Sequence, residues 1–240
     1  MLTVVRRRLI RSRAGLDSAH IAAGGIQLCA VASGGNFVDM TNGGIGTIGG
    51  APVAVMDGAL GPAVKFAANP DSIGIPGKST MSYATNTLAV IFRINTVTST
   101  QAFLSTGTSG TDLNFLATTT NGANNFLTVS RQGLATAGNL VAAPVGGPYF
   151  FAASENQVAG TSAINWVGAD LATGQITSGS TSIGSWSLGI RNGTFNIGSR
   201  GAGNLFGLSN ISAAMISNQF LSISVLRQWA TDPWSLWYRK

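Results

Sequence analysis

Residues 88–94 read Leu-Ala-Val-Ile-Phe-Arg-Ile, a nearly continuous apolar run in which Arg93 stands near the end. Periodicity alone does not separate a strand from a short helix in such a run, but turn residues on both sides favour a strand. A strand with one solvated face alternates apolar and polar residues, so an unbroken apolar run is typical of a strand covered on both faces. We therefore expect residues 88–94 to form a central strand of a sheet.

Shorter apolar or alternating runs recur on both sides of this segment. They cover residues 26–32, 51–56, 63–68, 101–107, 114–119, 124–130, 148–154, 163–169 and 194–199. Segments rich in Gly, Asn and Ser separate the runs, among them residues 41–50 and 177–182. About a dozen short strands with turn signals between them predict an all-β antiparallel sandwich.

One short helix is predicted near the C-terminus. Ser222 or Ser224 is suited to cap its N-terminus, and Pro233 ends it. Its apolar face would hold Val225, Leu226 and Trp229. Trp229, Trp234 and Trp237 are three of the five tryptophans of the chain. This aromatic density indicates that the chain end packs onto the fold.

The charge of the chain is concentrated at its N-terminus. The formal net charge is +6, and residues 1–13 hold five of the fourteen Lys and Arg side chains and no acid. Only 9% of all residues are charged, against ~25% in an ordinary soluble domain. We interpret residues 1–24 as a basic arm with its lead-in and residues 25–240 as one sandwich domain. A surface this poor in charge favours association, so we expect neighbouring subunits to cover part of it.

Several short motifs follow one another in an order that resembles a known family. They are residues 61–66 (GPAVKF), 88–93 (LAVIFR), 195–198 (FNIG), 211–215 (ISAAM) and 221–236. This order resembles the concanavalin A-like, laminin-G-like jelly-roll domain of the kind found in bacteriophage and prophage structural proteins. The resemblance covers about residues 25–238 and implies an antiparallel jelly-roll β-sandwich with one short C-terminal helix. It also implies a structural role in a virion.

Candidate catalytic and metal-binding groups are scarce. Glycoside hydrolysis needs two carboxylates on either side of the scissile bond, and Glu155 is the only glutamate. His20 and Cys29 are the only histidine and cysteine, which leaves too few ligands for zinc. We interpret His20 as a surface or interface residue and Cys29 as a buried small hydrophobe. The clustered carboxylates of the calcium-binding relatives are missing, so we expect no metal, no cofactor and no enzymatic activity.

The basic arm has three interpretations. Its positive charges are Arg6, Arg7, Arg8, Arg11 and Arg13. They could neutralise nucleic-acid phosphates, contact a neighbouring subunit or form a solvated tail. No basic body or aromatic groove accompanies them, so nucleic acid is disfavoured and contact with a neighbour is preferred. The longest uncharged stretch, residues 201–226, is too polar for a membrane span, so no membrane partner is expected.

These observations favour a non-enzymatic virion structural protein, such as a decoration, head-fibre or tail-associated module. The arginine arm would tether it to other virion proteins, and the protein would form a homo-oligomer within the phage particle. The alternative is a carbohydrate-binding module for a receptor or surface glycan, with Tyr83, Trp166 and Trp186 as stacking residues. Core packing is the commoner role for such aromatics. A glycoside hydrolase ranks third.

Overall fold

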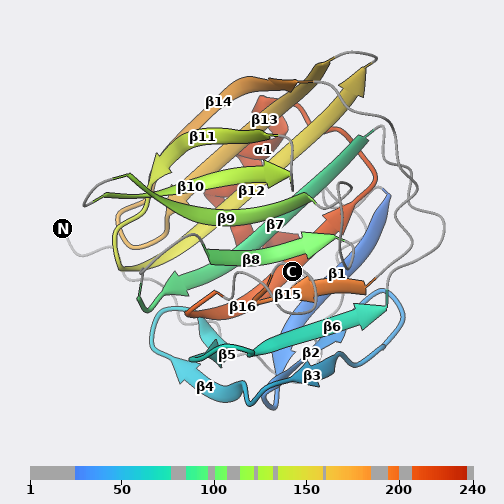
Figure 1. Cartoon of the computed structure of the whole chain (residues 1–240), viewed down its shortest axis with the longest axis vertical. Helices are drawn as coiled ribbons and strands as arrows, with labels where there is room; N and C mark the ends of the chain where they lie inside the picture. Colours follow the sequence, from blue (N-terminus) through green and yellow to red (C-terminus); the bar gives the residue numbers. More distant parts are fainter. Residues whose placement is uncertain are drawn as a thin grey trace.

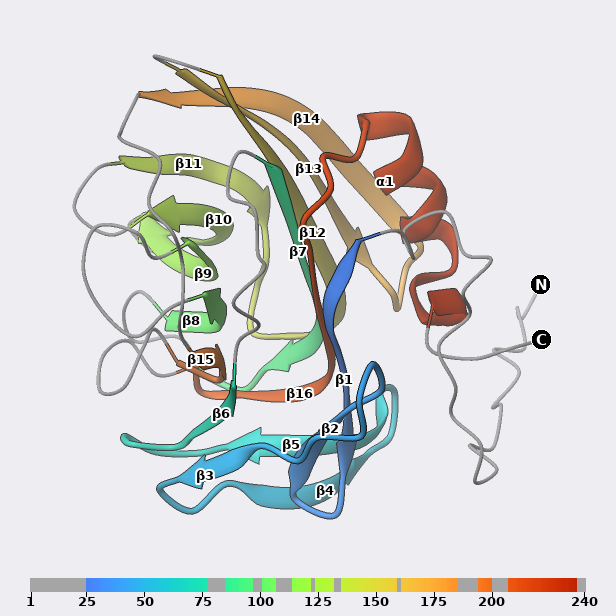
Figure 2. The same ribbon diagram turned by 90° about the vertical axis from the view of Figure 1, so that its right-hand side faces the viewer.

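The computed structural model describes residues 25–76, 85–96, 101–106, 114–121, 124–131, 135–158, 161–184, 194–199 and 207–236. Two antiparallel sheets pack face to face, and a short helix covers the outer face of the larger sheet (Figures 1 and 2). The all-β sandwich with one C-terminal helix is therefore confirmed. The basic arm, residues 1–24, lies outside the described residues.

The larger sheet has nine strands. In chain order they are β1 (Ile26–Ser33), β2 (Asn36–Asp39), β4 (Val53–Asp57), β5 (Gly61–Phe66), β7 (Thr85–Ile94), β12 (Gly146–Val158), β13 (Thr161–Asp170), β14 (Gln175–Gly184) and β16 (Ser209–Ser217). Their spatial order is β14-β13-β12-β7-β16-β1-β2, and the β4–β5 hairpin joins β16 beside β1. Strands distant in sequence are therefore neighbours, as in a jelly roll.

The smaller sheet has seven strands. In chain order they are β3 (Thr47–Gly49), β6 (Ser72–Pro76), β8 (Gln101–Thr106), β9 (Asn114–Asn121), β10 (Asn124–Arg131), β11 (Ala135–Ala142) and β15 (Thr194–Ile197). Their spatial order is β11-β10-β9-β8-β15-β6-β3. Strand β3 ends the smaller sheet, and β4 ends the β5 branch of the larger sheet, on the same side of the molecule (Figure 1).

The predicted central strand is confirmed. Strand β7 lies between β12 and β16 in the larger sheet. Its even-numbered residues, such as Val90 and Phe92, belong to the core between the sheets, whereas Ala89 and Ile91 belong to a second core beneath the helix. The apolar run is continuous because both faces of β7 are covered. Arg93 lies beyond the residues of β7 that pack in the second core, and its side chain is 29% exposed.

The predicted helix is also confirmed, as α1 (Ile223–Thr231) followed by a 3-10 turn, η1 (Pro233–Leu236). Ser222 is the N-cap, and its hydroxyl accepts a hydrogen bond from Val225 N. Leu226, Trp229 and Leu236 are buried on the larger sheet. The Trp229 indole N–H donates to Pro233 O at 3.0 Å, which ties the helix to the turn. Within the described part of the chain, no helix is long and apolar enough to cross a bilayer.

Two segments predicted as loops contain strands. Residues 177–182 lie in β14, which pairs with β13 from Asp170↔Gln175 to Thr161↔Gly184. Their Ser, Thr and Gly composition is typical of a loop, yet an edge strand with a solvated face accepts it. Within residues 41–50, Thr47–Gly49 forms β3 against β6. In both cases pairing with a neighbouring strand outweighs the local preference of these residues for a loop.

Candidate functional site

Most of the residues proposed for binding lie outside the described residues. This holds for Arg6, Arg7, Arg8, Arg11 and Arg13 of the arm, for Tyr83 and Trp186, and for His20. The structure leaves their predicted roles untested. Trp166, on β13, is described and packs half-buried against the core between the sheets. A Cβ atom on Gly179 would lie 2.7 Å from Trp166 Cζ2, so the indole covers the backbone of the neighbouring strand β14.

Glu155 and Cys29 are both buried. Glu155 Oε2 accepts a hydrogen bond from Asn86 Nδ2 at 3.0 Å, and the two residues are cross-strand partners on β12 and β7. Cys29 is fully buried, as predicted. Burial, and then the negative charge of Asp39, raises the pKa of the Cys29 thiol. Neither side chain is placed to act on a ligand at the surface.

Three polar side chains line up across the larger sheet at the end of β7. Asn210 on β16 pairs with Lys65 on β5 and with Arg93 on β7. The residues flanking them in sequence, among them Phe66 and Ile94, belong to the core between the sheets. Since side chains alternate along a strand, the three point to the opposite, outer face. We call Lys65, Asn210 and Arg93 the polar rung.

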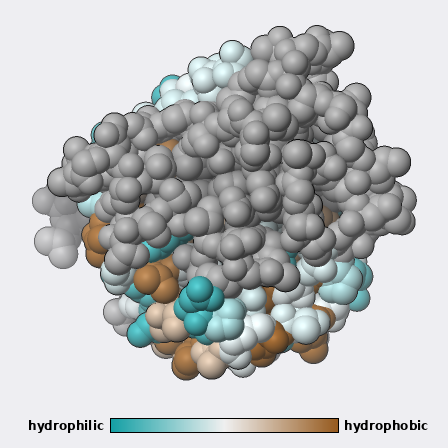
Figure 3. All heavy atoms as spheres, viewed as in Figure 1, coloured by the Kyte–Doolittle hydropathy of each residue, from teal (hydrophilic) through white to brown (hydrophobic). Residues whose placement is uncertain are grey.

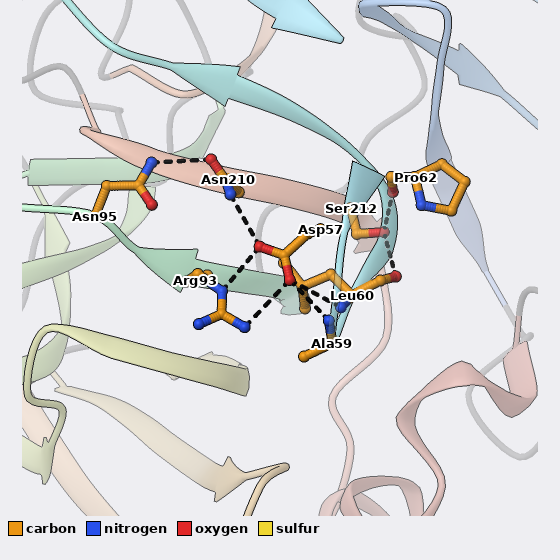
Figure 4. A network of polar contacts seen from close by, with 8 residues as sticks. All are labelled: Asp57, Ala59, Leu60, Pro62, Arg93, Asn95, Asn210 and Ser212. Carbon is orange, nitrogen blue, oxygen red and sulfur yellow. Dashed lines mark hydrogen bonds and ion pairs between the residues drawn. The ribbon is translucent and has the colours of Figure 1, made fainter. Parts of the chain in front are cut away.

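Asp57, at the end of β4, binds two members of the polar rung, Arg93 and Asn210 (Figure 4). Its carboxylate accepts from Arg93 Nε at 2.8 Å and Nη2 at 3.1 Å, and from Asn210 Nδ2 at 2.9 Å. The backbone N–H groups of Ala59 and Leu60 donate to it at 2.9 and 3.2 Å. The carboxylate therefore joins β7, β16 and the turn after β4.

The same contacts keep Asp57 ionised. Burial alone would raise its pKa, but the hydrogen bonds from Asn210, from the Ala59 and Leu60 amides and from Arg93 outweigh it and hold the pKa below its ordinary value. The Asp57 side chain is 4% exposed. Its charge is thus paired with that of Arg93, and the ammonium of Lys65 is left without an acid partner among the described residues.

An open hollow of about 460 Å³ adjoins the polar rung. Its lining residues are Lys65, Phe66, Ala67, Ile94, Asn95, Thr96, Val145, Gly146 and Leu208. Asn95 joins the hollow to the rung because its Nδ2 donates to Asn210 Oδ1 at 2.9 Å (Figure 4).

Backbone contacts fix the wall of this hollow. Asn95 N and Thr96 N both donate to Leu208 O, at 3.0 and 3.4 Å. Gln101 braces the same pair of segments: its Nε2 donates to Thr96 O at 2.6 Å, and its Oε1 accepts from Leu208 N at 3.1 Å. The end of β7 and the start of β16 are thereby joined, so the hollow has a preorganised wall.

The site combines a few polar groups with apolar surface. Lys65 supplies a cation, and Asn95 and Thr96 supply an amide and a hydroxyl. Val145 is 56% exposed and adds an apolar flank. Such a set can hydrogen-bond a polyhydroxylated ligand and pack against its C–H groups. Among the described residues, no group of three His, Cys, Asp or Glu side chains could hold a metal ion.

Sequence reasoning missed the polar rung. Lys65, Arg93 and Asn210 are far apart in the chain, and only the pairing of β5, β16 and β7 brings them together. One signal was present: Arg93 is the single charge in the apolar run at residues 88–94. A charged side chain at the end of a buried strand needs a partner of opposite charge, and Asp57 provides it.

Comparison with known proteins finds no matching family model and no matching curated protein. Among solved structures, domain 4 of the GH43 extracellular arabinanase AbnA from Geobacillus stearothermophilus, in complex with arabinotriose, matches with a TM-score of 0.59 and 15% identity. The match covers 85% of this chain and 98% of that domain. A mutant Trypanosoma rangeli sialidase matches with a TM-score of 0.61 and 14% identity, over 92% of this chain and 36% of the sialidase.

A third structure, a mutant of HCR/D, matches with a TM-score of 0.57 and 9% identity, over 86% of this chain and 50% of that one. At these identities the likeness shows the fold alone. The chain is a β-sandwich domain similar to domain 4 of an arabinanase, and it spans about a third of the sialidase. None of the three is described as a virion protein, so the virion part of the family resemblance stays a prediction.

Proposed function

We propose that this domain binds carbohydrate at the polar rung and the adjoining hollow, without cleaving it. The alignment of the exposed Lys65 with the half-buried Asn210 and Arg93 on the outer face of the larger sheet carries the proposal. The likeness to an arabinanase domain that was solved with arabinotriose supports it. Carbohydrate binding, the alternative interpretation of the sequence, thereby becomes the preferred one, although at other residues than the aromatics first considered.

The geometry suits a saccharide because two of its amide side chains, Asn95 and Asn210, are fixed before a ligand arrives. Side chains already held by hydrogen bonds lose little conformational freedom on binding. Asn95 and Asn210 are held by each other, and Asn210 is also held by Asp57. Saccharide hydroxyls both donate and accept hydrogen bonds, as do the amide groups that face them.

The state of Asp57, the carboxylate next to the site, supports binding without cleavage. A hydrolase needs a carboxylic acid that can donate a proton, and such acids have raised pKa values. The pKa of Asp57 is lowered instead. Its oxygens already accept five hydrogen bonds, so they are also unsuited to attack a sugar ring.

Calorimetric titration of the full chain tests the proposal, with arabinotriose and sialic acid as the first neutral and acidic probes and an oligosaccharide array as the wider screen. We expect binding that Lys65→Ala or Asn95→Ala weakens at least about tenfold, the loss of roughly 1.4 kcal/mol that one hydrogen bond to a charged or amide group supplies. Arg227→Ala, an exposed cation on α1, is the matched control and should bind as the unaltered chain does.

No binding to any saccharide by the folded protein would contradict the proposal, and so would equal affinity in all variants. Release of shorter sugars from an oligosaccharide would contradict its non-catalytic part. The predicted tether to virion proteins is a separate matter, because the arm lies outside the described residues.

A further inference from the structure

Lys65 is the only charged side chain among the described residues that line the hollow. It is exposed on β5, whereas its neighbours Val64 and Phe66 are buried. Figure 3 shows hydrophilic surface beside hydrophobic surface where Figure 1 places β4 and β5. The ammonium of Lys65, with its three N–H donors, is therefore accessible to a ligand in the hollow.

Asp71 is an acid close to Lys65 in the chain, but it is engaged with the backbone. Its Oδ1 accepts a hydrogen bond from Ala51 N at 2.9 Å, and its Oδ2 accepts from Ala67 N and Ala68 N at 2.8 and 3.0 Å. The residue is only 4% exposed. Backbone amides, rather than the ammonium of Lys65, thus stabilise the negative charge of Asp71.

Asp57 is the second acid in this region, and its charge is already paired. Its carboxylate is shared by Arg93 and Asn210, and the ion pair that it forms with Arg93 is the only one among the described residues. One positive and one negative charge cancel within that pair. The charge of Lys65 is left for a ligand, and no carboxylate on the described wall of the hollow repels an anion.

We infer that the hollow selects an acidic saccharide, whose carboxylate or sulfate group binds the ammonium of Lys65. The inference rests on the proposed function and adds to it the charge of the ligand. Asn95 and Thr96, which line the same hollow, supply an amide and a hydroxyl for the sugar hydroxyl groups. Hydrogen bonds between two charged groups are stronger than those to a neutral hydroxyl. The site therefore favours the charged form of a saccharide over its neutral form.

Calorimetric titration of the full chain with matched pairs of saccharides tests the inference. Trigalacturonic acid and its methyl ester share their sugar rings and differ in charge, and lactose 3′-sulfate and lactose form the corresponding pair for sulfate. We expect the acidic member to bind at least about fivefold more tightly, which is the contribution of an exposed ion pair of about 1 kcal/mol. The preference should decrease at about 1 M salt, where the Debye length is only ~3 Å.

Variants at Lys65 assign the preference to its charge. Lys65→Met should bind both members of a pair equally, and Lys65→Arg should keep the preference. Arg227→Met is the matched control, because it removes the same charge from α1, where Arg227 contacts Ser178 of β14 rather than the hollow. It should keep the preference of the unaltered chain. Thermal unfolding checks that each variant folds, and the ratio of two affinities separates charge selection from a general loss of binding.

Equal binding of the acidic and neutral members by the unaltered chain overturns the inference and leaves carbohydrate binding standing. Binding confined to neutral saccharides has the same meaning, and so has an acid preference that persists in folded Lys65→Met. A preference within one pair alone supports the inference and identifies the anionic group as carboxylate or sulfate. If neither these saccharides nor any on the array bind, the proposed function fails together with the inference.

Discussion

Asp57 is the residue on which the candidate site depends. Its carboxylate joins β4 to β7 through Arg93 and to β16 through Asn210, and it caps the turn at Ala59 and Leu60. A buried acceptor with so many donors costs much to remove, because each donor then loses its partner. The positions of Arg93 and Asn210 in the polar rung therefore depend on one side chain that does not itself line the hollow.

We expect Asp57→Ala to lower the free energy of unfolding by about 3 kcal/mol, because it leaves Arg93 and two backbone amides without their acceptor. Urea denaturation measures this loss. Asp232→Ala, which removes an exposed carboxylate, is the control and should change stability by less than about 1 kcal/mol. Equal losses in the two variants would show that the Asp57 network does not stabilise the fold.

Acid should weaken the fold through two aspartates. Hydrogen bonds lower the pKa of Asp57, and the backbone amides of Ala51, Ala67 and Ala68 do the same for Asp71, in each case against the opposing effect of burial. An aspartate whose pKa is lowered by folding stabilises the protein above the ordinary Asp pKa of ~3.9. This stabilisation is lost as the pH falls through the pKa of the folded state. We therefore expect the urea concentration at the unfolding midpoint to decrease as the pH is lowered below about 4. The decrease should be smaller in Asp57→Asn.

Cys29 should be inert in the folded protein. Burial and the nearby Asp39 raise the pKa of its thiol, and the thiolate is the reactive form. At about pH 8 a thiol reagent should modify the folded chain far more slowly than the urea-unfolded chain, because a free cysteine has a pKa near 8.5. Rapid modification without urea would show that β1 opens readily, which contradicts the burial of Cys29.

At the scale of elements, helix α1 closes the second core. Trp229 is 1% exposed, and its ring packs edge-on against Phe150 of β12 with ring centroids 5.0 Å apart. We expect Trp229→Ala to cost about 4 kcal/mol, the usual loss for a large buried aromatic. Gln228→Ala, on the exposed side of the same helix, should cost less than about 0.5 kcal/mol. Similar thermal unfolding of the two variants would contradict this docking.

Some elements could be predicted from the sequence because their signals are local. The apolar run of β7 and the serine cap of α1 need no knowledge of distant residues. Strand β14 could not be predicted in the same way, because its Ser, Thr and Gly residues are typical of a loop and only β13 makes them a strand. The polar rung depends in addition on the register of three strands, which no local pattern specifies.

At the scale of the whole molecule, the low charge content fits the way the sandwich is covered. Apolar side chains fill one core between the sheets and a second under α1, so the larger sheet is buried on both faces over most of its centre. Among the described residues, the large apolar side chains that stay exposed lie within residues 45–56 and at Val145 beside the hollow. The site proposed for carbohydrate binding therefore lies where this double cover ends.

The most direct test of the central claim is a ¹H–¹⁵N NMR titration of the full chain with a saccharide that the array identifies. Binding at the polar rung predicts concentration-dependent shifts of the side-chain amides of Asn95 and Asn210 and of the backbone amides of Lys65 and Gly146. Signals from the Trp166 indole should stay in place. Shifts that gather at Trp166 and leave the rung unchanged, or a spectrum that no saccharide changes, would contradict the account.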